Sequence, residues 1–164
     1  MAEKFLNLKI TSRGKLLNVS GQTVKIGERL KRRLGDKGFL KKDTRKIGQM
    51  IRDQISSNIA RGLRYDTKQP VKRLKRATIK RKGFSKPLVE TGKMLLGVIV
   101  EYKGGDVIVR MKKNKYPKKS KGQTSSATVE DVAKYNQKTR PFFGINKKDL
   151  TKFTKIIAGG KLLK

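Results

Sequence analysis

The sequence predicts an α+β fold, in which an antiparallel β-sheet carries a packed amphipathic helix over residues 44–61 and is followed by a C-terminal helix over residues 147–158. Three observations predict this fold. Apolar residues alternate with polar ones in the first thirty residues, an isoleucine recurs at every fourth position from residue 47 to residue 59, and two strand-like runs flank Gly104-Gly105.

The N-terminal part, residues 1–43, is expected to be a β-rich segment with a basic linker, ahead of an α+β part over residues 44–164. At 164 residues, the two parts are expected to form one compact domain overall. Apolar residues alternate on both sides of Ser20-Gly21, which predicts a hairpin with its turn at this pair. Residues 27–38 are strongly basic and are compatible with one short helix.

The helix over residues 44–61 is the clearest element of the prediction. Its isoleucines form one apolar stripe along a helical face. Asp43 and Thr44 are the candidate N-caps, and Gly62 can end the helix in a left-handed conformation. Gly48 lies inside the helix, where it costs about 1 kcal/mol relative to Ala. Its presence therefore predicts close packing against a neighbouring element.

The following segment, residues 64–86, is polar and basic and predicts a mostly exposed loop with one short helical turn. Thr91 is then expected to cap a second short turn. Residues 98–102 and 107–111 alternate as half-buried strands and form the best hairpin of the chain. A basic stretch containing Pro, Gly and Ser follows at residues 112–127.

Two helical segments complete the predicted fold. Residues 129–136 can form one or two helical turns. Asn146 is expected to cap the C-terminal helix, with Asp149 in its first turn, where the helix dipole favours an anion. Gly159-Gly160 is expected to end that helix.

Positive charge is the main compositional signal, because 44 Lys and Arg minus 12 Asp and Glu gives +32. The net charge is +8 over residues 1–43, +12 over 44–93, +6 over 94–121 and +6 over 122–164. The charge therefore belongs to the whole chain and not to a detachable tail. Self-repulsion at this charge opposes compaction, so we expect a polyanion nearby.

The composition also argues against several classes of function. Without Cys or His, the chain has no disulfide, no thiol nucleophile and no imidazole for proton transfer or zinc binding. Gly92-Lys93 does not complete a phosphate-binding loop, because Pro87 and Met94 stand where that loop needs Gly and Ser or Thr. We expect no enzymatic activity, no cofactor and no metal site. No apolar run is long enough for a membrane span or a secretion signal, so synthesis in the cytoplasm and no membrane partner are expected.

Candidate polyanion contacts fall in two clusters of cations, which can bind phosphates through counterion release. The clusters are Lys72, Arg73, Lys75, Arg76, Lys80, Arg81 and Lys82, and Lys112, Lys113, Lys115, Lys118, Lys119 and Lys121. Phe84 and Tyr116 lie in or beside them and could stack on bases. A solvated face is the simpler interpretation of any single cation. As sets, the clusters favour contact with DNA, RNA or the acidic surface of a partner protein, and charge alone does not distinguish these three.

Three stretches resemble the phage virion morphogenesis family, which includes the tail completion proteins of Mu-like phages and is related to head-tail joining and tail-terminator proteins. The order and spacing of the first two stretches add weight to the resemblance. Residues 86–95 (KPLVETGKML) are similar to the family's Pro-Leu-Val-(Asp/Glu)-Thr-Gly-(Arg/Lys)-Leu signature, which precedes a β-hairpin. Residues 139–145 (TRPFFGI) are similar to its Arg-Pro-Phe-Leu-Gly-Leu motif. The helix over 44–61 with residues 74–82 resembles a third, Leu-and-Thr-containing run.

The resemblance implies a structural virion protein of the phage neck or the head-proximal end of the tail, acting as a tail completion or tail terminator protein and not as an enzyme. It implies a homo-oligomeric ring, taken as a hexamer, that joins tail to head around the DNA channel and contacts neighbouring neck and tail proteins and packaged DNA. The motif positions with an expected structural role are Leu88, Val89, Thr91, Gly92, Arg140, Pro141 and Phe142. We expect the first two in the core, the next two in a cap and tight turn, and the Pro-Phe-Phe stretch between the last helix and the sheet.

A ring of six copies would carry 6 × 32 = 192 positive formal charges, which DNA in the lumen or acidic neighbouring rings would have to screen. We expect one cluster, residues 112–121 first, to face the lumen or a partner ring. The main alternative is a ribosomal or other RNA-binding protein, which explains the charge equally well. A nucleoid-type DNA-binding protein is a third possibility, without a recognisable reading helix. The ribosomal or RNA-binding alternative does not explain the ordered pair of motifs at residues 86–95 and 139–145.

Overall fold

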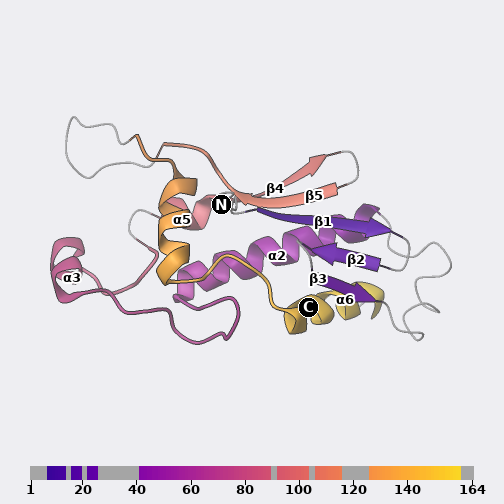
Figure 1. The fold of residues 1–164 in the computed structure, drawn as a ribbon, viewed down its shortest axis with the longest axis horizontal. Coiled ribbons are helices and arrows are strands. Elements are labelled where there is room, and N and C mark those ends of the chain that lie inside the picture. Colours follow the sequence, from indigo (N-terminus) through magenta and orange to yellow (C-terminus); the bar gives the residue numbers. More distant parts are fainter. Residues whose placement is uncertain are drawn as a thin grey trace. The chain divides into compact units, whose positions relative to one another are not determined.

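The computed structural model describes residues 7–13, 16–19, 22–25, 41–89, 92–103, 106–115 and 126–159, and it has the predicted α+β class (Figure 1). The elements in chain order are β1 (Asn7–Arg13), β2 (Leu16–Val19), β3 (Gln22–Lys25), α2 (Lys41–Arg61), α3 (Arg76–Lys82), α4 (Lys93–Leu96), β4 (Val98–Lys103), β5 (Asp106–Met111), α5 (Val129–Thr139) and α6 (Lys147–Gly159). The short helix expected over residues 27–38 lies outside the described residues.

The five strands form one sheet with the order β3-β2-β1-β5-β4. β2 pairs antiparallel with both β1 and β3, and Val19 lies opposite Gln22. This register confirms the predicted N-terminal hairpin, although the turn residues Ser20 and Gly21 are not described. The bounds of β4 and β5 agree with the predicted second hairpin.

The chain divides into two compact units, which are described separately. The described residues of unit 1 lie within Gln54–Ile99 and Arg110–Gly144. Those of unit 2 lie within Asn7–Asp53, Val100–Val109 and Ile145–Lys164. Helix α2 and the β4–β5 pair contribute residues to both units. The expected division of the chain after residue 43 stays a prediction.

In unit 2, the first half of α2 packs against strand residues. The isoleucine stripe is fully buried, and a Cβ atom added to Gly48 would lie 2.5 Å from Cγ1 of Val107. The close approach predicted at Gly48 is therefore confirmed. The predicted start of the helix is wrong, because α2 already begins at Lys41. Asp43 and Thr44 are buried residues of its first turns and not N-caps, and Asp43 still meets the positive end of the helix dipole.

Helix α6 also belongs to unit 2 and lies against β3. The side-chain oxygen Oδ1 of Asn146 accepts a hydrogen bond of 2.8 Å from the backbone N–H of Asp149, which confirms the predicted cap. Leu150 and Phe153 are buried, as the predicted apolar face requires. The helix ends at Gly159, one residue beyond the predicted end.

In unit 1, the second half of α2 is joined by α3, α4, α5 and the adjoining strand residues. The N-cap of α4 is Gly92, whose φ of 71° places it in the left-handed region, while the predicted cap Thr91 is not described. Helix α5 begins with a reciprocal capping box, in which Oγ1 of Thr128 accepts from the N–H of Asp131 and the Asp131 carboxylate accepts from the N–H of Thr128.

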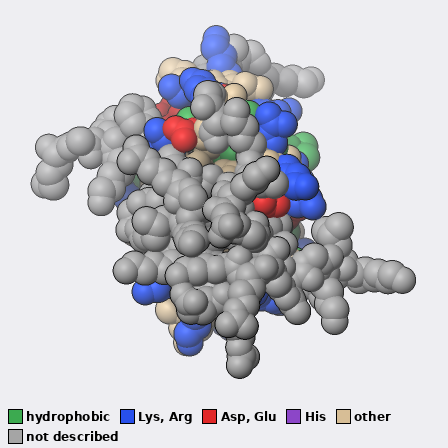
Figure 2. All heavy atoms as spheres, turned by 90° about the vertical axis from the view of Figure 1, so that its right-hand side faces the viewer, with side chains coloured by type: hydrophobic (Ala, Val, Ile, Leu, Met, Phe, Trp, Pro, Cys, Tyr) green, Lys and Arg blue, Asp and Glu red, His purple; other side chains and the backbone are tan. Residues whose placement is uncertain are grey.

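No helix among the described residues is long and apolar enough to cross a membrane. Figure 2 shows one face of the molecule, on which Lys and Arg side chains are spread widely and acidic side chains are few wherever described residues are visible. This distribution agrees with the spread of charge along the sequence.

Candidate polyanion-binding site

The first predicted cluster of cations lies in unit 1, in a segment that we call the basic loop (residues 72–86). It contains eight Lys and Arg and no Asp or Glu, so its net charge is +8 over fifteen residues. None of its fifteen residues is buried. In Figure 1 the loop carries α3 away from α5 and from the C-terminal end of α2. The fold therefore buries no part of its most cationic segment.

The two ends of the basic loop meet at Gly62, directly after α2. The N–H of Val71 donates a hydrogen bond of 2.8 Å to the carbonyl oxygen of Gly62. A Cβ atom at Gly62 would lie 3.6 Å from Cδ of Pro87 and 3.9 Å from Cγ2 of Val71. Gly62 has a φ of 63°, which confirms the left-handed helix end predicted there. The segment is thus a compact surface loop with a closed base.

Leu88 completes the base of the loop. Its side chain is buried, which agrees with the predicted core position, whereas Val89 is half-buried. The φ of Leu88 is 64°, in the left-handed region that a leucine rarely adopts. Burial of the side chain offsets the conformational cost, which is about 1–2 kcal/mol for a residue with a Cβ.

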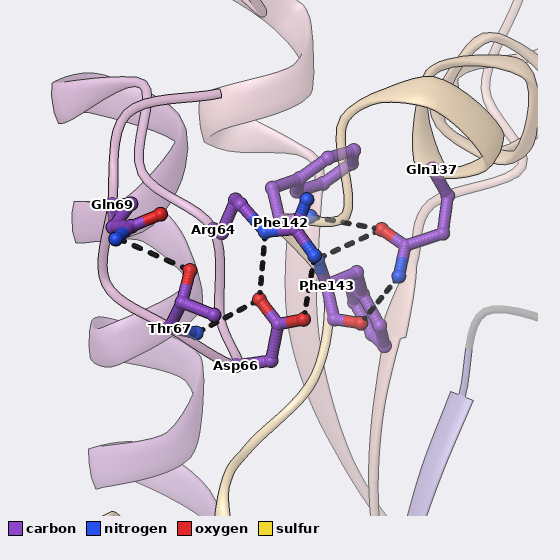
Figure 3. Close-up of polar contacts among 7 residues, drawn as sticks. All are labelled: Arg64, Asp66, Thr67, Gln69, Gln137, Phe142 and Phe143. Atoms are coloured by element: carbon purple, nitrogen blue, oxygen red, sulfur yellow. Dashed lines mark hydrogen bonds and ion pairs between the residues drawn. The ribbon is translucent and has the colours of Figure 1, made fainter. Parts of the chain in front are cut away.

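A turn over residues 64–69 precedes the basic loop and is held by an ion pair (Figure 3). The Arg64 guanidinium donates to both carboxylate oxygens of Asp66, at 3.0 and 2.7 Å, and the N–H of Thr67 also donates to Asp66. The hydrogen bonds from Arg64 lower the pKa of Asp66 to about 2. Across the turn, Leu63 and Pro70 form an isolated antiparallel bridge. Arg64 is therefore a cation that has a carboxylate partner, Asp66, within its own turn.

The cations of the basic loop contrast with Arg64. Within the described part of the chain, six of its exposed cations make no ion pair with a carboxylate. These six are Lys72, Arg73, Lys75, Arg76, Lys80 and Lys86. Lys82 lies over the ring of Phe84, with Nζ 5.1 Å from the ring centroid, so this half-buried aromatic residue contacts a cation of its own loop. Whether Phe84 also stacks on bases stays a prediction.

Helix α3 is short and exposed. It has seven residues, none of them buried, and its N-cap residue Lys75 makes no side-chain cap hydrogen bond. Its C-cap is Gly83, in the left-handed conformation, whose N–H donates to the carbonyl of Ile79. Lys80, Arg81 and Lys82 in its last turn suit the negative end of the helix dipole, but Arg76 lies at the positive end. An anion on this surface would relieve that mismatch.

Arg140, from the second motif stretch, connects the base of the basic loop to α5. Its Nε donates a hydrogen bond of 2.9 Å to the carbonyl oxygen of Lys72, and a second guanidinium nitrogen lies 3.5 Å from Oδ1 of Asn136. The loop leaves the body of unit 1 at this point. Arg140 therefore fixes the first residue of the loop.

The neighbouring segment Pro141 to Gly144 is held by several hydrogen bonds to its backbone. Oε1 of Gln137 accepts from the N–H groups of Phe142 and Phe143, and its Nε2 donates to the carbonyl of Phe143 (Figure 3). The buried Asn58 of α2 donates to the carbonyl of Phe142, whose ring is fully buried.

Two further contacts pack this segment against the turn before the basic loop. The N–H of Tyr65 donates to the carbonyl of Pro141 at 3.0 Å. A Cβ atom at Gly144 would lie 2.6 Å from Cδ2 of Tyr65, so the aromatic ring covers the position of the missing side chain. These contacts join the segment to α2, α5 and the turn; its expected place between the last helix and the sheet stays a prediction.

The second cluster of cations differs from the basic loop. Lys113 and Lys115 are exposed and Lys112 is half-buried, with its N–H bonded to the carbonyl of Gly97. Hydrogen bonds from Thr128 lower the pKa of Asp131, and Lys113 acts on that carboxylate in the same direction. The described start of this cluster therefore interacts with a carboxylate, that of Asp131. The remaining members, Lys118, Lys119 and Lys121, and the nearby Tyr116 lie outside the described residues.

Sequence reasoning missed two features of the site. The role of Gln137 could not be read locally, because it depends on the chain returning to α5 five residues later. The capping box of α5 does carry a local signal, since Thr128 and Asp131 have the spacing that such a box requires. No group of three or more acidic, His or Cys side chains that could hold a metal ion occurs among the described residues.

No family model matches the chain, and neither the curated proteins nor the solved structures contain a significant match to it.

Proposed function

We propose that this protein is a structural component of a bacteriophage particle, at the neck or the head-proximal end of the tail, where copies form a homo-oligomeric ring around the DNA channel. One observation carries the proposal. Two of the three stretches that resemble the virion morphogenesis family, residues 86–95 and 139–145, occur in the family's order, and both supply residues to the base of the basic loop. Residues 86–95 supply Pro87 and Leu88, and residues 139–145 supply Arg140.

In this role the motif residues build and hold the fold, while the basic loop contacts a polyanion of the particle. The burial of Leu88 and Phe142 is compatible with a scaffold function. The six exposed cations of the loop that have no carboxylate partner among the described residues supply positive charge that a neighbour can neutralise. Tail completion and tail termination both need such a scaffold, and neither needs a catalytic centre.

The assembly state of the full chain tests this proposal. The protein is treated with nuclease, and its mass is measured by light scattering after size exclusion at several salt concentrations, with negative-stain microscopy of the same fractions. We expect a closed ring that persists without nucleic acid. A chain that remains monomeric in every condition, and forms larger species only with RNA, would contradict the ring and favour the RNA-binding alternative.

A further inference from the structure

We propose that the basic loop binds the phosphate backbone of a nucleic acid without reading its base sequence. This inference rests on the proposed function, in which the loop faces a polyanion, and it names the chemistry of that polyanion. Three properties of the loop distinguish a phosphate backbone from an acidic protein surface: its exposed composition, the state of α3, and the way in which the loop is mounted.

The exposed surface of the loop offers cations and almost no apolar area. Its large apolar side chains, Leu74, Ile79 and Phe84, are all half-buried, so they are partly turned to their own chain. The exposed positions carry six Lys or Arg between residues 72 and 81, together with small residues such as Ala77. Interfaces between proteins rely on buried aromatic and apolar anchors and are depleted in Lys. Interfaces with nucleic acids are polar and strongly positive, and much of their bonding goes to phosphates.

Helix α3 is poorly stabilised by its own chain. A helix this short is marginal in water, and it buries no side chain. Arg76 and Lys80 are four residues apart, so these like charges lie on the same face and repel each other. A row of phosphates along α3 would remove this repulsion. Binding should therefore order the helix, which gives the proposal a second measurable consequence.

The loop is attached at its base by contacts at both of its ends. Gly62 closes its two ends, and Arg140 fixes the carbonyl of Lys72. This mounting presents the cations away from unit 1 without an element that could enter a groove, since α3 has only two turns. Contact with the backbone is therefore favoured over readout of base edges, which needs side chains held deep in a groove.

The test compares the salt dependence of binding for two charge-matched variants of the full chain. The loop variant carries Arg73→Gln, Lys75→Gln, Arg76→Gln and Lys80→Gln. The control variant removes the same charge from exposed positions of α6, with Lys147→Gln, Lys148→Gln, Lys152→Gln and Lys155→Gln. A chain of charge +32 will bind any polyanion to some degree, so the informative quantity is the slope of log K against log salt.

With duplex DNA, four lost phosphate contacts should reduce that slope by about 3.6 in the loop variant, and by about 2.8 with a single strand. The control variant should reduce it by less than about 1. Equal reductions in both variants would overturn the proposal. The possible sources of the backbone are distinguished by comparing duplex DNA, duplex RNA and single strands of matched sequence. Independence from base sequence is tested with two scrambled duplexes, whose affinities should agree within about threefold. A difference above tenfold between the scrambled duplexes would show base readout and contradict the inference.

Poly-glutamate serves as the probe for binding to an acidic protein surface. A loop-dependent loss of binding to poly-glutamate, with binding to nucleic acid unchanged, would replace the phosphate backbone by a protein partner. Hydrogen exchange of the Ile79 and Gly83 amides, which donate within α3, should slow when duplex DNA binds. A double variant, Arg73→Gln with Arg76→Gln, should lose about 1.8 from the slope with duplex DNA and covers the case in which the fourfold change disturbs folding.

Failure of this inference and failure of the proposed function give different results. If the protein forms rings but the loop variant keeps the wild-type slope, the virion role stands and the loop is not the phosphate site. If the slope depends on the loop but the protein never assembles, the phosphate site stands and the ring is wrong.

Discussion

The segment Pro141 to Gly144 and the basic loop lie in the same unit and are linked through Arg140, which binds the carbonyl of Lys72, yet they differ in almost every physical respect. The first has a fully buried ring at Phe142, backbone groups bonded to Gln137 and Asn58, and no ionisable side chain. The second has +8 of charge and no buried side chain. The segment Pro141 to Gly144 therefore contributes to folding, whereas the basic loop carries exposed charge and buries no side chain. Stability and binding should therefore respond to mutation at different places.

The largest expected effect follows from removing the ring of Phe142. Phe142→Ala should lower the free energy of unfolding by about 3–5 kcal/mol, because it leaves a cavity at a fully buried site. Urea unfolding followed by circular dichroism measures the change. The loop variant with four Gln substitutions serves as the contrast, and it should stay within about 0.5 kcal/mol of the wild type because its positions are exposed. Comparable losses in both proteins would abolish the distinction drawn between the two regions.

A smaller effect is expected at Gln137. Gln137→Leu keeps most of the side-chain volume but leaves the N–H groups of Phe142 and Phe143 and one carbonyl without their partner. The cost should be about 2–3 kcal/mol in the same urea measurement. Gln137→Glu is the comparison variant, since it keeps the acceptor for both N–H groups while it loses the donor and places a charged oxygen near the Phe143 carbonyl, and it should cost about 1 kcal/mol. If Leu is tolerated as well as Glu, these hydrogen bonds do not hold the segment.

The smallest effect concerns the turn between the two regions and appears only in acid. Arg64 lowers the pKa of Asp66 to about 2 in the folded chain, from an ordinary value of 3.8. A lowered pKa means that the ionised carboxylate stabilises the fold above pH 3.8, and that this contribution is lost as the pH falls from about 4 through 2. The pair is well exposed to solvent, so its contribution should stay below about 1 kcal/mol.

The comparison of wild type with Asp66→Asn isolates this contribution from the other carboxylates that titrate in acid. The difference in unfolding free energy between the two proteins should be constant from pH 5 to 7 and should shrink below pH 4. A difference that is unchanged at pH 2.5 would mean that the Asp66 carboxylate does not act through its charge.

The elements with a strong local pattern could be predicted from the sequence. The isoleucine stripe of α2, the alternation in β5, the Asn146 cap and the close approach at Gly48 all follow from the residues themselves and agree with the structure. The predicted start of α2 is wrong because Asp and Thr are residue types that often cap helices, whereas Asp43 and Thr44 are buried within the first turns of this helix. Local capping preference was overridden by packing.

The site could be predicted only in part. The cationic stretch of the basic loop and its short helix were evident from the sequence. The closure of its two ends at Gly62, and the bond from Arg140 to its first residue, join positions far apart in the chain, and no local pattern encodes such contacts. The pairing of Arg64 had a local signal, because Asp66 follows it by two residues, whereas no Asp or Glu lies within the basic loop.

The meeting of Val71 and Pro87 at Gly62 has a consequence for how this chain can be altered. A connection of a few residues from Val71 to Pro87 would bypass the fifteen residues between them, and every buried side chain of unit 1 would remain. Such a deletion would take eight positive charges from the molecule and leave 32 − 8 = +24. The loop is in this sense a replaceable module, at which sequences of other length or charge could be grafted onto an unchanged scaffold.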